Sequence, residues 1–161
     1  MTVNVYDILD SNGIEYRKYE HEAVFTVEDA NRLYDDIAGA HTKNLFLRNK
    51  DKSQYYLFII ASHKRADLEA VARQIGETKL SFANSEELLT YLGVTPGSVS
   101  ALALINDTSH AVGVLIDREV WSADAVNAHP NINTATLTFA QNDFHAFFEI
   151  LRYTPIVVRA E

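Results

Sequence analysis

The sequence reads KNLFLR at residues 43–48 and YYLFIIAS at residues 55–62. Both runs are rich in aromatic and aliphatic residues, and the second contains two β-branched isoleucines; such residues favour strands. The polar residues 49–53 between them have a composition typical of a hairpin turn. The sequence therefore predicts two central strands, residues 44–48 and 55–62, at the core of a sheet.

Helices and further strands are predicted on both sides of this hairpin. Residues 67–75 and 85–92 each place apolar side chains at helical spacing, and each run stops at a glycine, which suits a helix end. Further helices are predicted over residues 3–9, 27–37 (with Thr26 as N-cap) and 143–151. Strands are predicted over residues 14–21, 80–83, 102–105, 111–116, 134–139 and 156–158. This mixture indicates an α/β fold.

Length and composition indicate one folded domain. The chain has 161 residues, of which 47% are hydrophobic and 22% charged, so disordered and fibrous classes are excluded. It has no cysteine, which excludes a disulfide framework, a thiolate zinc site and a cysteine nucleophile, and is compatible with a reducing cytoplasm. The first residues do not have the order of a signal peptide, and no apolar run is long enough for a membrane span. We therefore expect a cytoplasmic protein without a membrane partner.

The charge is unevenly distributed along the chain. The formal net charge is −8, which argues against general nucleic-acid binding and against DNA as a partner. Residues 43–79 nevertheless carry eight Lys or Arg against four Asp or Glu, a balance of +4 that leaves −12 for the rest. This segment forms either a basic face on an acidic body or ordinary solvated strand ends and a polar helix face.

Familiar catalytic motifs are absent, but three polar features stand out. The sequence has no nucleophile elbow, phosphate loop or dinucleotide motif, and its six histidines lack metal-ligand spacing. Lys43 opens an apolar strand, where its ammonium either holds an anionic or carbonyl group or is simply solvated. His129 lies in a polar loop before a strand, as a binding residue or a hydrogen-bonded structural one. The turn at residues 96–100 offers closely spaced backbone N–H groups.

Five ordered segments carry a family resemblance: TKNLFL at 42–47, LSFA at 80–83, LGVTPGSVS at 92–100, LIND at 104–107 and HPNINTAT at 129–136. The chain resembles the prolyl-tRNA editing domain family of the YbaK/ProX type, and within it the free-standing alanyl-tRNA(Pro) deacylases. The resemblance implies a single α/β domain over residues 1–161, with a mixed, partly closed β-sheet and flanking helices. It also implies hydrolysis of the ester that joins mischarged alanine to tRNA(Pro). Such editing is needed because a site sized for proline cannot exclude a smaller amino acid sterically.

The resemblance also implies roles for particular residues. The expected catalytic group comprises Lys43, Gly97, Ser98 and Ser100. The expected substrate-binding group comprises Phe25, Thr26, Asn44, Ala128, His129 and Asn131. The expected tRNA-binding group comprises Lys50, Lys52, Lys64 and Arg65. No metal or cofactor is expected. The expected partners are the acceptor end of aminoacylated tRNA(Pro) and prolyl-tRNA synthetase, and the protein is expected to be a monomer.

Two positions depart from the family pattern. Ala101 stands where the family's glycine loop has proline, which removes a restraint on φ beside the reacting centre. Ala128 stands where the family often has an aromatic residue, and this truncation favours serine or another small amino acid if the side chain points into the pocket. The loss of proline leaves open an alternative function, a module that binds aminoacyl-tRNA or an amino acid without hydrolysing it.

Overall fold

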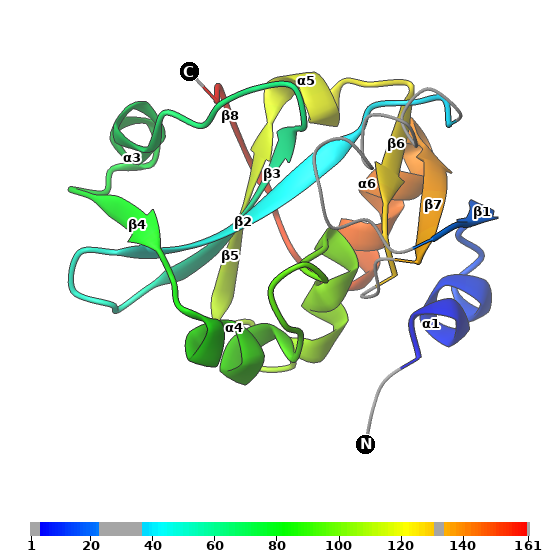
Figure 1. The fold of residues 1–161 in the computed structure, drawn as a ribbon, viewed down its shortest axis with the longest axis horizontal. Helices are drawn as coiled ribbons and strands as arrows, with labels where there is room; N and C mark the ends of the chain where they lie inside the picture. The colour runs from blue at the N-terminus through cyan, green and yellow to red at the C-terminus, as the bar shows by residue number, and fades with distance from the viewer. Residues whose placement is uncertain (1–3, 23–36, 131–133, 161) are drawn as a thin grey trace.

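The structure is a computed structural model, and it describes residues 4–22, 37–130 and 134–160. The strands within these ranges form a five-stranded sheet of order β4-β2-β3-β5-β8 and a three-stranded sheet of order β1-β7-β6 (Figure 1). The strands are β1 Arg17–Glu20, β2 Thr42–Asn49, β3 Tyr55–Ala61, β4 Leu80–Phe82, β5 Val112–Asp117, β6 Ala125–Ala128, β7 Ala135–Ala140 and β8 Ile156–Val158. The helices are α1 Val5–Ser11, α3 Leu68–Ile75, α4 Ser85–Leu92, η1 Ala101–Asn106 (a 3-10 helix), α5 Arg118–Trp121 and α6 Gln141–Ile150.

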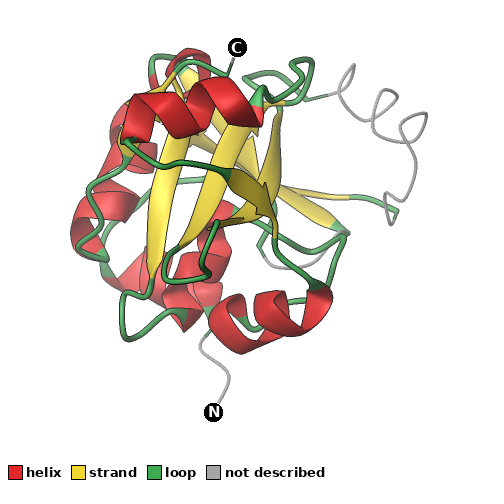
Figure 2. Cartoon of the chain, turned by 90° about the vertical axis from the view of Figure 1, so that its left-hand side faces the viewer, coloured by secondary structure: helices red, strands yellow, loops and turns green. Residues whose placement is uncertain are grey.

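The predicted hairpin forms the centre of the five-stranded sheet. β2 and β3 pair antiparallel, and β5 and β8 extend the sheet in parallel from β3. α3 covers one face of this sheet, where Val71 and Ala72 pack on buried residues of the central strands (Figure 2). The other face packs on the apolar side of the three-stranded sheet and on α4, η1 and α6. The predicted mixed α/β class with flanking helices is confirmed.

The two sheets meet where β2 begins. Ala40 pairs with Val126 of β6 in an isolated parallel bridge, just before β2 enters the five-stranded sheet. The strands therefore divide into two sheets that touch at one bridge, where the sequence led us to expect one partly closed sheet. Among the described residues this bridge is the only ladder contact between the sheets, and it fixes the place of the candidate site.

Local signals explain most helix ends. The Asp67 side chain accepts a hydrogen bond from the Ala70 N–H at the start of α3, and Gly76 ends this helix with φ of +78°. α4 begins with a capping box between Asn84 and Glu87. The predicted helix at 27–37 lies outside the described residues.

Two parts of the secondary-structure prediction are wrong. Residues 102–105, predicted as a strand, belong to η1, in which Ala101–Ile105 are all buried. A short apolar run has the same appearance in a buried strand and in a buried helix, and the Ser100 cap decides for the helix. The prediction also missed α5, capped by Asp117, and β6, whose sequence AVNA has little strand propensity.

Candidate active site

The candidate site begins where β2 and β6 separate. The Ala40 N–H donates to the Ala125 carbonyl at 2.9 Å, and the Asn127 N–H donates to the Ala40 carbonyl at 3.0 Å. One step further, the Thr42 hydroxyl donates to the Asn127 carbonyl at 2.8 Å, in place of a backbone group. β2 then runs diagonally away toward β4, whereas β6 stays with β7 (Figure 1).

Where β2 and β6 separate, polar side chains from both segments lie on one face. Asn127 Nδ2 lies 3.4 Å from His41 Nδ1, and Asn127 Oδ1 accepts a hydrogen bond from Thr138 Oγ1 at 2.5 Å. Side chains alternate along a strand, so Lys43 and His129 continue this face two residues beyond His41 and Asn127. This alternation puts Lys43 and His129, which stood out most in the sequence, on the same face of the two segments.

His129 is held as a neutral imidazole. Its Nδ1 is buried and has no hydrogen-bond partner. Burial, and secondarily the nearby His21, lower the pKa of His129 from 6.5 to about 4. A neutral ring at pH 7 can line a pocket or exchange hydrogen bonds, but it does not offer a permanent charge to the tRNA.

His21 is a neighbour of the site that sequence reasoning missed. Its Nδ1 lies 2.7 Å from the Glu22 carbonyl, and its Nε2 lies 2.9 Å from Thr136 Oγ1. A carbonyl only accepts, so Nδ1 is the donor, and a neutral His21 accepts the Thr136 hydroxyl proton at Nε2. Only the pairing of β1 with β7 brings these residues together, and no local sequence signal reveals it.

The glycine loop is anchored to the backbone of His129. Gly97 has φ of +93° in a turn closed by the Ser98 N–H and the Thr95 carbonyl at 3.0 Å. The Ser100 hydroxyl donates to the His129 carbonyl at 2.5 Å and accepts from the Leu102 N–H at 3.0 Å. The only donor hydrogen of the Ser100 hydroxyl is used in the first of these bonds, so Ser100 positions the loop beside His129.

The predicted substrate-binding residues fall in three places. Asn44 points to the face opposite Lys43, and its Oδ1 is buried without a partner. Ala128 lies in the core opposite Leu137, on the other face of β6 from His129, so its truncation does not widen the His129 side of the site. Phe25, Thr26 and Asn131 lie outside the described residues.

The predicted tRNA-binding residues also differ in placement. Lys50 and Lys52 are exposed at the hairpin tip, about 20 Å along β2 from Lys43. The Lys64 ammonium contacts the buried Asp117 carboxylate at 3.1 Å, which ties it to the protein itself.

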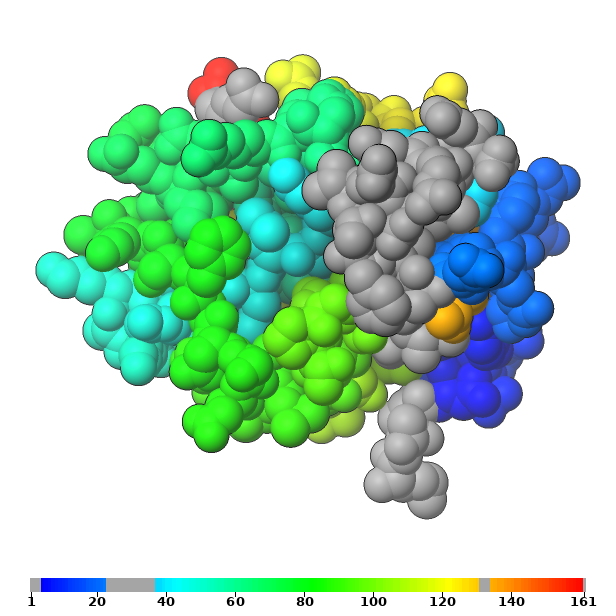
Figure 3. Space-filling model, in the orientation of Figure 1, coloured from blue at the N-terminus to red at the C-terminus, as the bar shows by residue number. Residues whose placement is uncertain are grey.

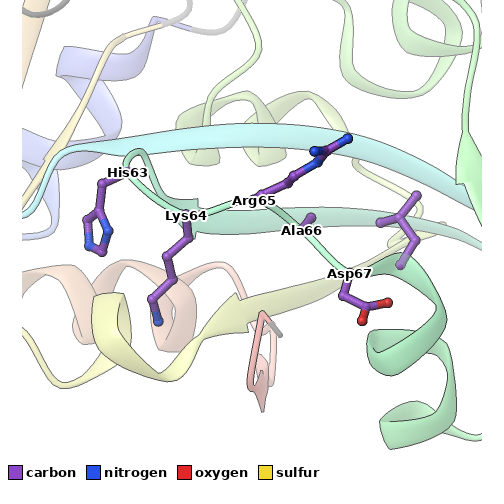
Figure 4. A pocket seen from close by; sticks show the side chains of 6 residues that line it. His63, Lys64, Arg65, Ala66 and Asp67 are labelled. Carbon is purple, nitrogen blue, oxygen red and sulfur yellow. The ribbon is translucent and has the colours of Figure 1, made fainter.

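Arg65 is exposed and lines an open depression of about 760 Å³ with His63, Lys64 and Asp67. Figure 4 shows Arg65 directed toward β2 and Lys64 directed to the other side.

Residues 4–22, 37–130 and 134–160 contain no cluster of three or more His, Cys, Asp or Glu side chains arranged for a metal ion. The helices within the same ranges are all too short or too polar to span a membrane.

Comparison with known proteins identifies the family. A sequence profile of the aminoacyl-tRNA editing domain matches residues 21–147. Prolyl-tRNA editing protein ProX of Acetoanaerobium sticklandii is 36% identical over 135 residues, which cover 84% of this chain and 82% of that protein. Prolyl-tRNA synthetase associated domain-containing protein 1 of Danio rerio is 32% identical over 154 residues, covering 94% and 83%. The chain therefore belongs to the aminoacyl-tRNA editing domain family.

A solved structure supports the same fold. The crystal structure of hypothetical protein APE2540 aligns with a TM-score of 0.75 at 19% identity, covering 96% of this chain and 97% of that one. At this identity the likeness concerns the fold alone.

Proposed function

We propose that the protein hydrolyses the ester of alanine mischarged on tRNA(Pro) and spares correctly charged proline. The membership of the editing family and the relatives named for prolyl-tRNA editing support this reaction class. The proposal is supported most strongly by the Ser100 bond that anchors the glycine loop to the His129 carbonyl, and by the strand alternation that puts Lys43 and His129 on one face where β2 leaves β6. In the proposal, an aminoacyl ester that enters the space between β2 and β6 meets the Lys43 ammonium, the neutral His129 imidazole and backbone N–H groups of the glycine loop.

In the proposed reaction, water attacks the ester carbonyl carbon and the bond to the ribose oxygen breaks. The amino acid leaves as a carboxylic acid that ionises, and the ribose oxygen takes the second proton of the water. Lys43 holds a phosphate or the ester carbonyl. Backbone N–H groups of the glycine loop other than that of Ser98, which closes the turn, stabilise negative charge that develops on the carbonyl oxygen. His129 limits the size of the bound side chain. The proposal involves no metal, so activity should survive a chelator.

Basic residues outside the site are proposed to contact tRNA phosphates. Arg65, Lys50 and Lys52 are exposed, and Lys50 and Lys52 lie at the far end of β2 from Lys43, so they can contact phosphates at a distance from the reacting ester. Lys64 contributes through the depression that it shares with Arg65. Such contacts weaken steeply as the salt concentration rises. We also propose prolyl-tRNA synthetase as the partner that hands over the substrate, and a single-domain monomer as the active form.

The test is a comparison of alanyl-, seryl- and prolyl-tRNA(Pro) hydrolysis by the purified protein, with and without EDTA. We expect rapid release of alanine, slow release of proline and no effect of EDTA. Faster release of serine than alanine would assign a different substrate. Tight binding of alanyl-tRNA(Pro) without release of any amino acid would instead establish the non-hydrolytic binding module.

A further inference from the structure

The outer edge of β2 has a gap in its pairing. Lys43 lies opposite Ile60, Asn44 opposite Ile59 and Leu45 opposite Phe58 in the antiparallel pair with β3. The Asn49 N–H and the His41 carbonyl both bond toward the β3 side, so odd-numbered residues of β2 form the ladder with β3. The N–H and C=O groups of even-numbered residues therefore point to the outer edge.

Among the described residues, this outer edge has partners at both ends and none between them. Ala40 is bonded to β6 at one end. At the other end the Phe46 carbonyl accepts from the Ala83 N–H at 2.9 Å, and residues 47–49 pair with β4. Within the described part of the chain, no strand pairs with Thr42 or Asn44 on this side. Both residues are only partly buried, and Figure 3 shows cyan atoms of β2 in a hollow beside the green atoms of the β4–α4 region.

The unpaired backbone N–H and C=O groups of β2 can hydrogen-bond a ligand, and the length of the gap limits the size of that ligand. Backbone groups that are partly withdrawn from water cost free energy unless they are bonded. The gap spans residues 42–45, which is too short for an added peptide strand of ordinary length. The Oδ1 of Asn44 is also buried without a partner, which marks the same residue as incompletely satisfied. The gap therefore fits one amino-acid unit.

We propose that the outward N–H and C=O of Asn44 bind the main-chain atoms of the esterified amino acid, in the manner of a strand pair. An α-aminoacyl ester carries a donor nitrogen and an acceptor carbonyl with the spacing of one strand residue. The Asn44 N–H donates to the ester carbonyl, and the Asn44 carbonyl accepts from the α-ammonium. Lys43 and His129 flank this edge, so the reacting carbonyl lies beside them. This inference rests on the proposed deacylase function.

The same geometry disfavours proline. The ammonium of alanine turns freely and can direct any of its three hydrogens at the Asn44 carbonyl. In a proline ester a ring carbon replaces one hydrogen, and the ring fixes the direction of the other two. Recognition of the main chain thus adds to whatever discrimination the side-chain pocket provides.

The first arm of the test compares alanyl-tRNA(Pro) with propionyl-tRNA(Pro), which lacks the amine, as enhancements over the spontaneous hydrolysis of each ester. We expect the enhancement for the propionyl ester to be at least tenfold lower. Equal enhancements would overturn the proposal while leaving the deacylase function intact.

The second arm uses the backbone. Asn44→Pro removes the outward N–H. It breaks no hydrogen bond to β3, because this N–H points away from β3, and proline is tolerated at such edge positions. Asn44→Ala is the matched control, which removes the side chain and keeps the N–H. We expect the alanyl enhancement to fall about tenfold or more in Asn44→Pro relative to Asn44→Ala, with both variants folded by circular dichroism. If both variants fold and have equal activity, the proposal is overturned. If Asn44→Pro does not fold, the comparison of the alanyl and propionyl esters decides whether the proposal stands.

If the wild-type protein releases no alanine, the proposed function fails and a binding measurement decides the inference. The probe is 3′-alanylamido-3′-deoxyadenosine, a stable amide analogue of the substrate end. A shift of the Asn44 amide resonance on titration, absent with the propionyl analogue, supports main-chain docking. Identical spectra with both compounds would overturn it.

Discussion

The burial of a neutral His129 makes stability depend on pH, and the size of the effect follows from the structure. The pKa of His129 is about 4 in the folded protein and 6.5 when exposed. The unfolded chain therefore binds the proton more tightly, and the folded state loses stability as the pH falls from 6.5 toward 4. Between pH 7.5 and pH 5.0 the loss from this residue is about 2 kcal/mol, and it approaches about 3 kcal/mol near pH 4.

The assay is urea unfolding of wild type and His129→Gln at pH 7.5 and pH 5.0. Other titrating groups contribute equally to both proteins, so the difference between the two pH slopes isolates His129. We expect wild type to lose about 2 kcal/mol more than His129→Gln over this interval. Parallel pH slopes would refute the conclusion that a neutral imidazole is buried at this position.

Three further predictions concern residues that hold the site in place. Ser100→Ala should cost about 1–3 kcal/mol in urea unfolding, because it removes both the bond to the His129 carbonyl and the helix cap; an unchanged midpoint would contradict this. Lys64→Met should destabilise by about 2 kcal/mol, because the buried Asp117 carboxylate loses its cation and keeps the N–H donors of Ala61 and Glu119; Lys64→Arg should recover part of the loss. Ala101→Pro should be neutral or stabilise by up to about 1 kcal/mol, since residue 101 is the first of η1; a lower melting temperature would show that the ring does not fit there.

The fold was largely predictable where local signals are strong. The hairpin of β2 and β3 and the helices α3 and α4 follow from apolar periodicity, turn composition and terminal glycines. Residues 102–105 were mispredicted because a five-residue apolar run has no period that separates helix from strand. β6 was missed because its alanines carry no strand signal, and its pairing with β7 alone creates it.

The candidate site was predictable only in part. Lys43 and His129 stood out in the sequence, but their common face depends on the bridge between Ala40 and Val126. The contacts of His21 likewise depend on pairing over more than a hundred residues. Such long-range pairing leaves no mark on the adjacent sequence, so neither the separation of β2 from β6 nor the open edge at Asn44 could be derived before the fold was known.

The measurement that tests the central claim most directly is single-turnover release of alanine from alanyl-tRNA(Pro) by wild type, Lys43→Ala and the control Lys79→Ala, whose lysine is exposed beyond the site. We expect fast release by wild type and Lys79→Ala. In Lys43→Ala we expect the rate to fall at least a hundredfold, which corresponds to about 3 kcal/mol of transition-state stabilisation, with an unchanged melting temperature. Equal rates in all three proteins would remove Lys43 from the reaction, and no release by wild type would contradict the proposed function.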